Sequence, residues 1–459
     1  MEQSVITRTV TVAPGRFAPG HLGELTQQLP FEMVDAALVA TGRTQSRLRD
    51  LPARVVVYLL VAGCLFAELG YVQVWQRLCA GLDGLPVATP TASALTQARR
   101  RLGPAPLQAL FALVCGPAPS TATGGVRIGG LLVCAIDGTT LSVADTPANH
   151  RVYTTQPGHH GGSGYPLLRL VALVACGTRS LIEVVFGPTS SGETTMTNQL
   201  AEHLHAGMLV LTDRNLTTAA LTGRIAATGA HLLGRCKANR KLPMVGRLHD
   251  GSWLSLLGGV QVRVIDAQIT IATRAGRASG SYRLATTLTD AHTWPATALV
   301  TLYHQRWAIE TAYLELKSSI LGGRVLRART PAGIDQEVHA LLVCYQLLRL
   351  AMADATSTQP GIDPDRASFT VALNTARDQL IQAAGVIAST TIDLVGKIGR
   401  AVLDNLLADR RLRVSPRVVK RAISKYNARG PTINRTSYKA TLSIDILASP
   451  TRLTTSAGP

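Results

Sequence analysis

The stretch GGLLVCAID, residues 129–137, is a continuous apolar run of strand length that ends in an acidic residue. Such a run is typical of a strand that is buried on both faces of a sheet. The Asp-Gly pair formed by Asp137 and the residue after it is also a turn signal. The stretch therefore predicts a buried strand that ends in a carboxylate.

Four further strand-like runs follow, and their order predicts the architecture of the sheet. LLRLVALVAC (167–176) and LIEVVFG (181–187) are separated by GTRS, which is typical of a hairpin turn. A helical segment then leads to the short apolar run MLVLTDR (208–214), and a second helical segment leads to HLLGRCK (231–237). Three strands, helix, strand, helix, strand is the order of a ribonuclease-H-like mixed sheet.

The composition changes along the chain in a way that predicts three domains. Residues 1–125 have helical periodicity and short turns. Residues 126–350 hold the mixed sheet, interrupted at about 238–299 by alternating Thr/Val/Ile-rich runs that predict an inserted antiparallel β unit. Residues 351–459 are expected to be helical and basic. The predicted fold class is α/β, with a ribonuclease-H-like core between helical N- and C-terminal regions.

The chain carries a large excess of positive charge. It has 46 Lys and Arg against 28 Asp and Glu, a formal net charge of +18 and a pI near 10.1. Twelve of these cations lie between Lys397 and Lys439, against two acids. The surplus favours a polyanionic partner, most commonly nucleic acid, and the basic tail is suited to phosphate contacts. A solvated basic helix would have the same composition.

Membrane insertion, secretion and a cysteine-based site are disfavoured. The longest apolar run, 55–67, has 13 residues and is too short to span a bilayer. The N-terminus lacks the apolar core of a secretion signal, so we expect a cytoplasmic protein. Seven scattered cysteines without a CxxC pair predict buried free thiols, and His159 and His160, among Gly and Pro, predict a loop.

A basic helix is predicted near the end of the N-terminal domain. Thr91 and Ser93 are both suited to cap a helix that carries Arg99, Arg100 and Arg101, and GPAP separates this helix from the next one. Two helices around a short turn are compatible with DNA binding, and equally with a small helical bundle.

The segment YHQRWAIETAYLELK, residues 303–317, predicts an amphipathic helix with a polar stripe at the edge of a buried face. At about 100° per residue the stripe is roughly 60° wide. It consists of Tyr303, Arg306, Glu310 and Lys317, and a separate apolar stripe consists of Ile309, Tyr313, Leu316 and Ile320. On this segment alone, a solvated face with ion pairs is the preferred interpretation.

Three carboxylates, one of them in the polar stripe, predict a metal site. Asp137 and Asp213 each end a buried strand, where a carboxylate loses solvation unless a cation meets it. Glu310 lies on a helix that can pack against the same sheet. The separations are 76 (213 minus 137) and 97 (310 minus 213) positions. Three such groups could hold two Mg²⁺ ions for in-line phosphoryl transfer.

The sequence resembles the DDE transposases of bacterial insertion sequences, in the insertion-sequence-four family with the signature Y-x2-R-x3-E-x6-K. Tyr303, Arg306, Glu310 and Lys317 complete that signature. The blocks AIDGTTLSVADTPAN, YPLLRLVALVACGTRS and LVLTDRNL also resemble the family and occur in its order. The likeness covers about 128–350 and, more loosely, the basic helix of the N-terminal domain.

The resemblance implies a metal site, a substrate and an assembly. Asp137, Asp213 and Glu310 would be the catalytic metal ligands, for two Mg²⁺ ions that Mn²⁺ can replace. Tyr303, Arg306 and Lys317 would bind phosphates of double-stranded DNA at the terminal inverted repeats of the element. The 1–125 domain would bind those ends, and the C-terminal region would contact DNA or a second protomer. A bacterial, DNA-associated homodimer acting on the element ends and on target DNA is expected.

The resemblance also implies a reaction sequence. A released 3′-hydroxyl makes a hairpin on the opposite strand, the hairpin is reopened, and the 3′-end joins target DNA. A flipped base assists hairpin formation, and an aromatic side chain of the β insertion can stack in its place. Trp253, Tyr282 and Trp294 are the candidates, and Trp307 is expected to pack beside the carboxylates.

Three other functions are compatible with parts of the pattern. A transposase-derived DNA-binding protein without activity would not need all three carboxylates. A ribonuclease-H-like nuclease would cut DNA without joining it, and the signature helix and the β insertion argue against this. A purely structural basic protein leaves the strand-end carboxylates unexplained. Fold alone does not separate these alternatives.

Overall fold

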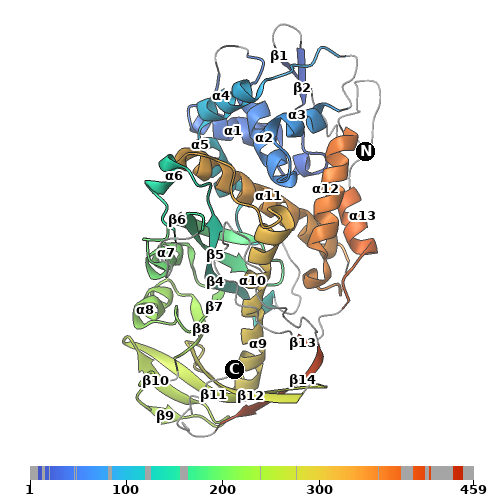
Figure 1. Ribbon diagram of the computed structural model, residues 1–459. Coiled ribbons are helices and arrows are strands. Elements are labelled where there is room, and N and C mark those ends of the chain that lie inside the picture. Colours follow the sequence, from blue (N-terminus) through green and yellow to red (C-terminus); the bar gives the residue numbers. More distant parts are fainter. Residues whose placement is uncertain are drawn as a thin grey trace.

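The computed structural model shows an elongated molecule with helices packed over one end of a large sheet and a β unit at the other end (Figure 1). The structure describes residues 9–12, 16–19, 21–45, 47, 49–80, 85–118, 126–155, 164–237, 239–274, 276–359, 361–383, 396–408, 413–414 and 438–447. His159, His160 and most of the basic tail lie outside these residues. All seven cysteines are free thiols, as the sequence predicts.

The N-terminal region is a helical domain preceded by a short hairpin. Its elements are β1 (Thr9–Val12), β2 (Arg16–Pro19), the 3₁₀ turn Leu25–Gln27, α1 (Phe31–Ala40), α2 (Ala53–Leu65), α3 (Tyr71–Cys79), α4 (Ala92–Leu102) and α5 (Ala105–Val114). α2 contains most of the long apolar run, and all but one of its residues are buried. Thr91 is the cap of α4, because its side chain accepts a hydrogen bond from the Ala94 N–H at 3.2 Å.

The core sheet has the strand order predicted from the sequence. Its elements are β4 (Leu131–Ser142), β5 (Leu167–Ala175), β6 (Leu181–Pro188), α7 (Glu193–Leu200), β7 (Met208–Thr212), α8 (Ala219–Ala227) and β8 (His231–Arg235). The strands lie in the order β8-β7-β4-β5-β6. β7 is parallel to β4 and β8 to β7, whereas β5 and β6 complete an antiparallel meander with β4. This topology confirms the ribonuclease-H-like fold.

The two faces of the sheet are covered by different helices. Cys134 and Ile136 of β4 pack into a cluster with residues of α7 and α8. Val133 and Ala135 pack into a larger cluster that includes the N-terminal helices and the helices after residue 296. Because side chains alternate along a strand, Asp137 belongs to the second face. Figure 1 shows α7 and α8 on one side of β4 to β8 and α10 and α11 on the other.

The inserted β unit continues the core sheet. Its strands are β9 (Gly246–Arg247), β10 (Trp253–Leu257), β11 (Val260–Thr273) and β12 (Gly276–Thr286), and β12 pairs with β8 through Leu284 opposite Arg235. The short strand β3 (Arg127–Ile128) pairs with β4. The antiparallel insertion is therefore confirmed, and it extends the sheet rather than forming a separate body.

The chain returns to helices after the insertion. These are α9 (Ala296–Tyr303), the 3₁₀ turn His304–Arg306, α10 (Trp307–Leu314), the π-helical turn Glu315–Ile320, α11 (Pro331–Ser357), the 3₁₀ turn Pro364–Arg366, α12 (Phe369–Ala383) and α13 (Lys397–Asp404). α11 is the one helix of the described chain that is long and apolar enough to cross a membrane, and 89% of its apolar window is buried in the protein. It lies between the sheet and the N-terminal helices (Figure 1).

Two sequence predictions are corrected. β4 does not end at Asp137 but continues to Ser142, because β5 pairs with it over that whole length. The C-terminal region is not helical throughout: β14 (Tyr438–Ile446) pairs with β11 along seven register positions, and β13 (Arg413–Val414) pairs with β14. The alternating apolar residues of β14 suit an edge strand better than a helix.

A buried ion network joins the π-helical turn to its surroundings. Glu315, 6% exposed, accepts hydrogen bonds from Arg179 at 3.1 Å and from the Tyr345 hydroxyl at 3.1 Å, and it also pairs with Arg349. Arg179 lies in the β5–β6 turn with φ of 57°, in the left-handed region, and pairs with Asp365 as well. The network connects sheet, α11 and the segment after it.

Glu315→Ala is expected to destabilise the protein by about 3–5 kcal/mol, because two buried guanidinium groups would lose their shared carboxylate. Urea denaturation of both proteins measures the loss. Glu202→Ala, at an exposed position, is the control. Equal stability of Glu315→Ala and the wild type would contradict a stabilising role for the network.

Candidate active site

The parallel pairing of β4 with β7 brings two carboxylates to adjacent positions. Ile136 is opposite Thr212 in the register, so Asp137 and Asp213 follow at the same level of the sheet. Asp137 Oδ1 accepts the Gly138 N–H at 2.9 Å. Asp213 Oδ1 accepts two backbone N–H groups, from Asn215 and Leu216, each at 2.8 Å. These bonds fix both side chains at the edge where β7 ends.

The polar stripe predicted on the signature segment faces this edge. The Tyr303 hydroxyl donates to the Thr212 carbonyl at 2.9 Å. Arg306 is 3.2 Å from Asp137 and 2.8 Å from Glu310, and Lys317 Nζ is 3.2 Å from Thr139 Oγ1. The structure therefore brings all four signature residues to the two strand-borne carboxylates.

The helix that carries the signature is less regular than the sequence predicts. It consists of α9, a 3₁₀ turn, α10 and a π-helical turn, and not of one α-helix. The four predicted apolar residues are nevertheless all buried: Ile309, Tyr313, Leu316 and Ile320. The Tyr313 hydroxyl donates to the Asp137 carbonyl at 2.6 Å and accepts the Ala172 N–H at 3.1 Å, so it fixes α10 against β4 and β5.

A fourth carboxylate, Glu193, was missed by the sequence analysis. It begins α7, and a Cβ placed on Gly138 would lie 2.3 Å from its Oε1 atom. The Glu193 side chain therefore lies against the backbone next to Asp137. β6 is parallel to β4, so a helix that starts just after β6 begins at the same edge of the sheet. That topological rule is the signal that could have found Glu193.

Burial dominates the electrostatics of this edge. Burial raises the pKa of Asp137 to about 6, with Asp213 and Glu193 adding to the rise and the Gly138 N–H and Arg306 opposing it. Burial likewise raises the pKa of Glu193, and Asp213 contributes. The pKa of Tyr303 rises to about 12, chiefly through burial. These acids are poorly solvated as anions.

The chemistry of these donors fits a hard divalent cation. Carboxylate oxygens are the ligands that Mg²⁺ prefers, and a cation would offset the lost solvation. Within the described part of the chain, however, no three His, Cys, Asp or Glu side chains are close enough together to hold a metal ion. Arg306 instead bridges Asp137 and Glu310.

The three aromatic candidates of the β insertion differ in position. Trp253 is 3% exposed and directs its indole N–H toward Asp266, and Trp294 packs against Gly129. Tyr282 is partly exposed beneath the Arg235 guanidinium, 4.1 Å from the ring centroid. Gly234 is opposite Thr212 in the register of β8 and β7, so Arg235 lies at the same level of the sheet as Asp213 and connects Tyr282 to the site.

Trp307 is nearly half exposed, at 47%, with the Arg306 guanidinium 5.6 Å from its ring. Its ring lies against Arg306, which pairs with Asp137 and Glu310, so the expectation that Trp307 packs beside the carboxylates stays a prediction. Its position one residue after Arg306 directs it away from the core that takes Ala308 and Ile309.

Comparison with known families accounts for most of the chain. The family described as Insertion element 4 transposase N-terminal matches residues 19–112, and the family described as Transposase DDE domain matches residues 128–347. The chain belongs to the insertion-sequence-four family of DDE transposases. The transposase thus acts on DNA, and domains of its family generally use divalent metal ions.

Two named transposases of Escherichia coli K12 agree with this assignment. The transposase is 27% identical to transposase InsG for insertion sequence element IS4 from Escherichia coli K12, over 88% of this chain and 93% of InsG. It is 27% identical to the putative transposase InsZ of the same organism, over 41% of this chain and 62% of InsZ. A piggyBac transposase synaptic complex with hairpin DNA, solved by cryo-electron microscopy, has a TM-score of 0.44 and 10% identity, over 84% and 85% of the two chains.

The raised pKa of Asp137 predicts how the stability of the metal-free transposase depends on pH. Between about pH 4 and pH 6 the folded protein keeps the Asp137 proton, whereas the unfolded chain has lost it. The free energy of unfolding therefore falls as the pH rises through this range. Asp137→Asn should therefore be more stable than the wild type above pH 6, by about 1–3 kcal/mol.

Urea denaturation from pH 4 to 8 with a chelator present measures this difference. It should be small near pH 4, where the folded group is protonated and the unfolded group is about half protonated. Asp354→Asn, at an exposed position on α11, is the control. A lower stability of Asp137→Asn at pH 7 would contradict the assignment.

Gly138→Ala is expected to slow DNA cleavage at least tenfold, about 1.4 kcal/mol in the barrier. The added Cβ would displace the Glu193 carboxylate while leaving the fold intact, because the obstructing atom is the end of a flexible side chain. The control is Gly246→Ala, where a Cβ meets nothing within 4 Å. In a Glu193→Ala background, Gly138→Ala should have no further effect on the cleavage rate, and additive losses would refute the mechanism.

Proposed function

We propose that this transposase cuts and joins the ends of its insertion element by two-metal phosphoryl transfer, with Asp137, Asp213 and Glu310 as metal ligands. The observation that carries the proposal is the joint placement of the two strand carboxylates and the signature helix at one edge of the sheet. Because Arg306 bridges Asp137 and Glu310 in this structure, metal binding would require these carboxylates to exchange Arg306 for the ions and to draw closer together. Mg²⁺, or Mn²⁺ in its place, would then supply activation of the attacking oxygen and stabilisation of the leaving one. Glu193 is proposed as a further oxygen donor.

The cationic and phenolic residues of the signature have a complementary task. A group of carboxylates alone would repel a DNA phosphate, so cations have to stand beside it. Arg306 lies between Asp137 and Glu310 with its side chain 13% exposed, and Lys317 lies by Thr139 on the continuation of β4. We assign phosphate binding at the cleaved strand to Arg306, Lys317 and Tyr303.

Tyr303 and Tyr282 are proposed to act on the DNA end itself. Tyr303 keeps its proton at neutral pH, with a pKa raised by burial to about 12, and it would donate this proton to a DNA phosphate in exchange for its bond to the Thr212 carbonyl. A hairpin intermediate requires the ends of two strands to approach closely, and unstacking a base makes room for that. Of the three insertion aromatics, Tyr282 is favoured to replace the base because it is partly exposed and connected to the site through Arg235.

The assembly and location follow from the reaction. Cutting two element ends and joining them to a target needs at least two active sites, so a homodimer assembled on the two ends is proposed. Its substrates are the terminal inverted repeats and target DNA in the bacterial cytoplasm.

Glu310→Gln should abolish cutting and joining while leaving DNA binding intact, because the amide keeps the shape of the side chain but loses the anionic ligand. The expected loss of rate is about a thousandfold or more. The measurement is a gel assay with Mg²⁺ and a duplex that carries one element end. Glu202→Gln is the matched control, because it removes an exposed carboxylate elsewhere.

Each outcome of this assay separates one alternative. Nicking, hairpin formation and joining by the wild type alone supports the whole proposal. Joining without a hairpin removes only that intermediate, and nicking without joining indicates a nuclease. Binding without any cleavage in Mg²⁺ or Mn²⁺ would leave a DNA-binding protein that has lost its activity.

A further inference from the structure

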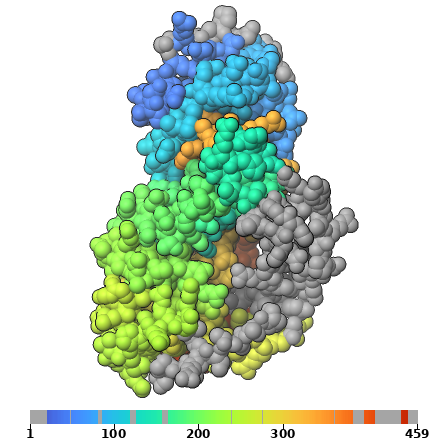
Figure 2. Space-filling view, turned by 60° about the vertical axis from the view of Figure 1, so that its left-hand side comes forward, coloured from blue at the N-terminus to red at the C-terminus, as the bar shows by residue number. Residues whose placement is uncertain are grey.

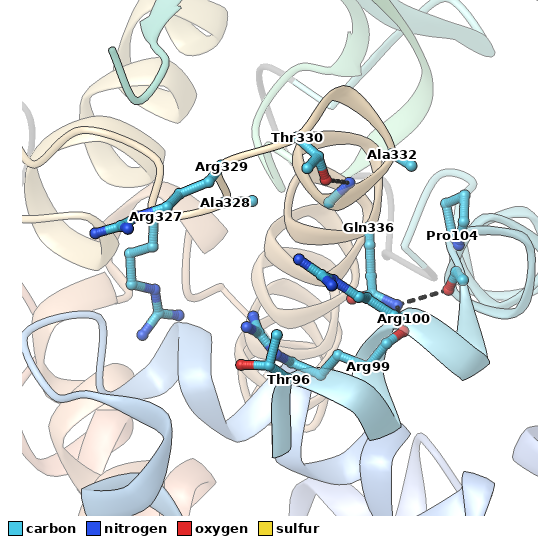
Figure 3. Close-up of a pocket in the computed structure, with 12 residues that line it drawn as sticks. Thr96, Arg99, Arg100, Pro104, Arg327, Ala328, Arg329, Thr330, Ala332 and Gln336 are labelled. Carbon is cyan, nitrogen blue, oxygen red and sulfur yellow. Dashed lines mark hydrogen bonds between the residues drawn. The ribbon is translucent and has the colours of Figure 1, made fainter. Parts of the chain in front are cut away.

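A basic pocket lies between the N-terminal domain and the start of α11, away from the carboxylates. Its volume is about 450 Å³. Figure 3 shows Arg99 and Arg100 reaching into it from α4, and Arg327 and Arg329 from the segment that precedes α11. No Asp or Glu lines it. In Figure 2, orange residues reach the surface between the blue N-terminal domain and the teal segment around α6, Pro147–His150.

The positive charge of the pocket is only partly balanced. Arg327 is paired with Glu337 at 3.3 Å and also donates to the carbonyls of Leu69 and Gly63. No ion pair is present between Arg99, Arg100 or Arg329 and any described carboxylate, and the Arg99 Nε atom is buried without an acceptor. Three guanidinium groups thus line the pocket without a counter-charge among the described residues, and their positive potential attracts an anion.

The walls of the pocket are held in place by polar contacts. Arg99 and Arg327 both stack on the Tyr71 ring, with their guanidinium carbons 4.0 and 4.5 Å from its centroid. The Gln336 amide donates to the carbonyls of Arg99 and Gly103 at 3.0 and 2.7 Å, so it joins the end of α4 to α11. A pocket prearranged in this way costs little to organise when its ligand arrives.

The first turn of α11 adds a further attraction for an anion. Ala332 and Gly333 line the pocket, and they belong to the N-terminal turn of a 27-residue helix that has no acidic residue in that turn. Pro331 has no N–H and the Gly333 N–H is donated to Thr330 Oγ1 at 3.2 Å, so the Ala332 N–H and the positive end of the helix dipole are the features that favour negative charge at this place. Together with the arginines, they suit a phosphate group rather than a carboxylate-bearing protein.

The chain connects this pocket directly to the catalytic strand. Leu326 donates to the Ser142 carbonyl at 2.9 Å, and Asn149 and Thr146 hydrogen-bond the carbonyls of Ala328 and Arg329 at 3.1 and 2.9 Å. Ser142 is five residues beyond Asp137 on β4, about 17 Å along the strand. That length corresponds to on the order of five base pairs of B-form DNA.

We propose that this pocket binds a backbone phosphate of the element-end DNA, so that the N-terminal and catalytic domains hold one duplex together. This rests on the proposed function, because the duplex must pass from Asp137 to the pocket. The side chains of Arg100 and Arg329 are exposed and supply the contact, whereas Arg99 and Arg327 also hold the walls in place.

The test compares Arg100→Ala/Arg329→Ala with the wild type in binding to a duplex that carries one element end, by fluorescence anisotropy at several salt concentrations. We expect the double variant to bind on the order of tenfold to a hundredfold more weakly, with the slope of log K against log salt smaller by about one to two. Arg101→Ala, on the same helix but outside the pocket, is the control. Affinity of the double variant within twofold of the wild type would overturn the proposal.

A second measurement locates the phosphate. Neutral methylphosphonates are placed one at a time along the duplex. The wild type should lose affinity at one or two positions roughly five base pairs from the cut, and the double variant should lose none there. An identical profile for both proteins would overturn the proposal. A pocket that binds only free phosphate would overturn it too: inorganic phosphate would then raise the melting temperature of the wild type but not of the double variant, and both proteins would bind DNA equally well.

These outcomes are separable from the proposed function. A wild type that binds and cuts while the double variant binds equally well refutes only the pocket. A wild type that binds but does not cut refutes the catalytic proposal, and the binding data still decide the pocket.

Discussion

The parallel pairing of β4 with β7 is the constraint on which the rest of this transposase depends. Its register sets Asp137 and Asp213 at one level of the sheet, on the face that α10 covers. Two half-buried carboxylates at neighbouring positions repel each other and lose solvation, which the raised pKa of Asp137 reflects. The Arg306 bridge and backbone N–H groups offset this cost, and the Tyr313 hydroxyl, which donates to the Asp137 backbone carbonyl, fixes α10 against β4.

The elements around this pair fix the position of one irregular helix, which consists of α10 and the π-helical turn after it. The π-helical turn that follows α10 contains both Lys317, which faces β4, and Glu315, which faces the opposite way into the buried ion network. π-Helical turns inside helices are often found at functional sites. Here the network fixes the turn that carries Lys317, so buried contacts away from the candidate active site determine where that cation lies.

Much of this arrangement can be predicted from the sequence. The spacing of apolar residues within a segment, and the order of the segments along the chain, can be read without knowing the fold. The apolar runs gave the strand order, and the spacing of Ile309 and Tyr313 gave the buried face of α10. Glu193 could not be found that way, since its contact with Gly138 joins residues 55 positions apart (193 minus 138). The strand at β14 was missed because a basic, Thr-rich tail resembles a solvated helix until β11 is available as a partner. The extension of β4 past Asp137 likewise depends on β5.

The pairing of β14 with β11 has a consequence for how the protein is made. The residues of β11, around 267–273, meet those of β14, around 440–446, across more than 160 positions of chain. Contacts between such distant segments form slowly, and an unpaired strand edge readily pairs with another chain. During synthesis at about 5–20 residues per second, β11 therefore waits for roughly 10–30 seconds with an open edge before its partner strand is made. The nascent chain is most prone to associate with its neighbours in that interval, while the catalytic sheet is otherwise complete.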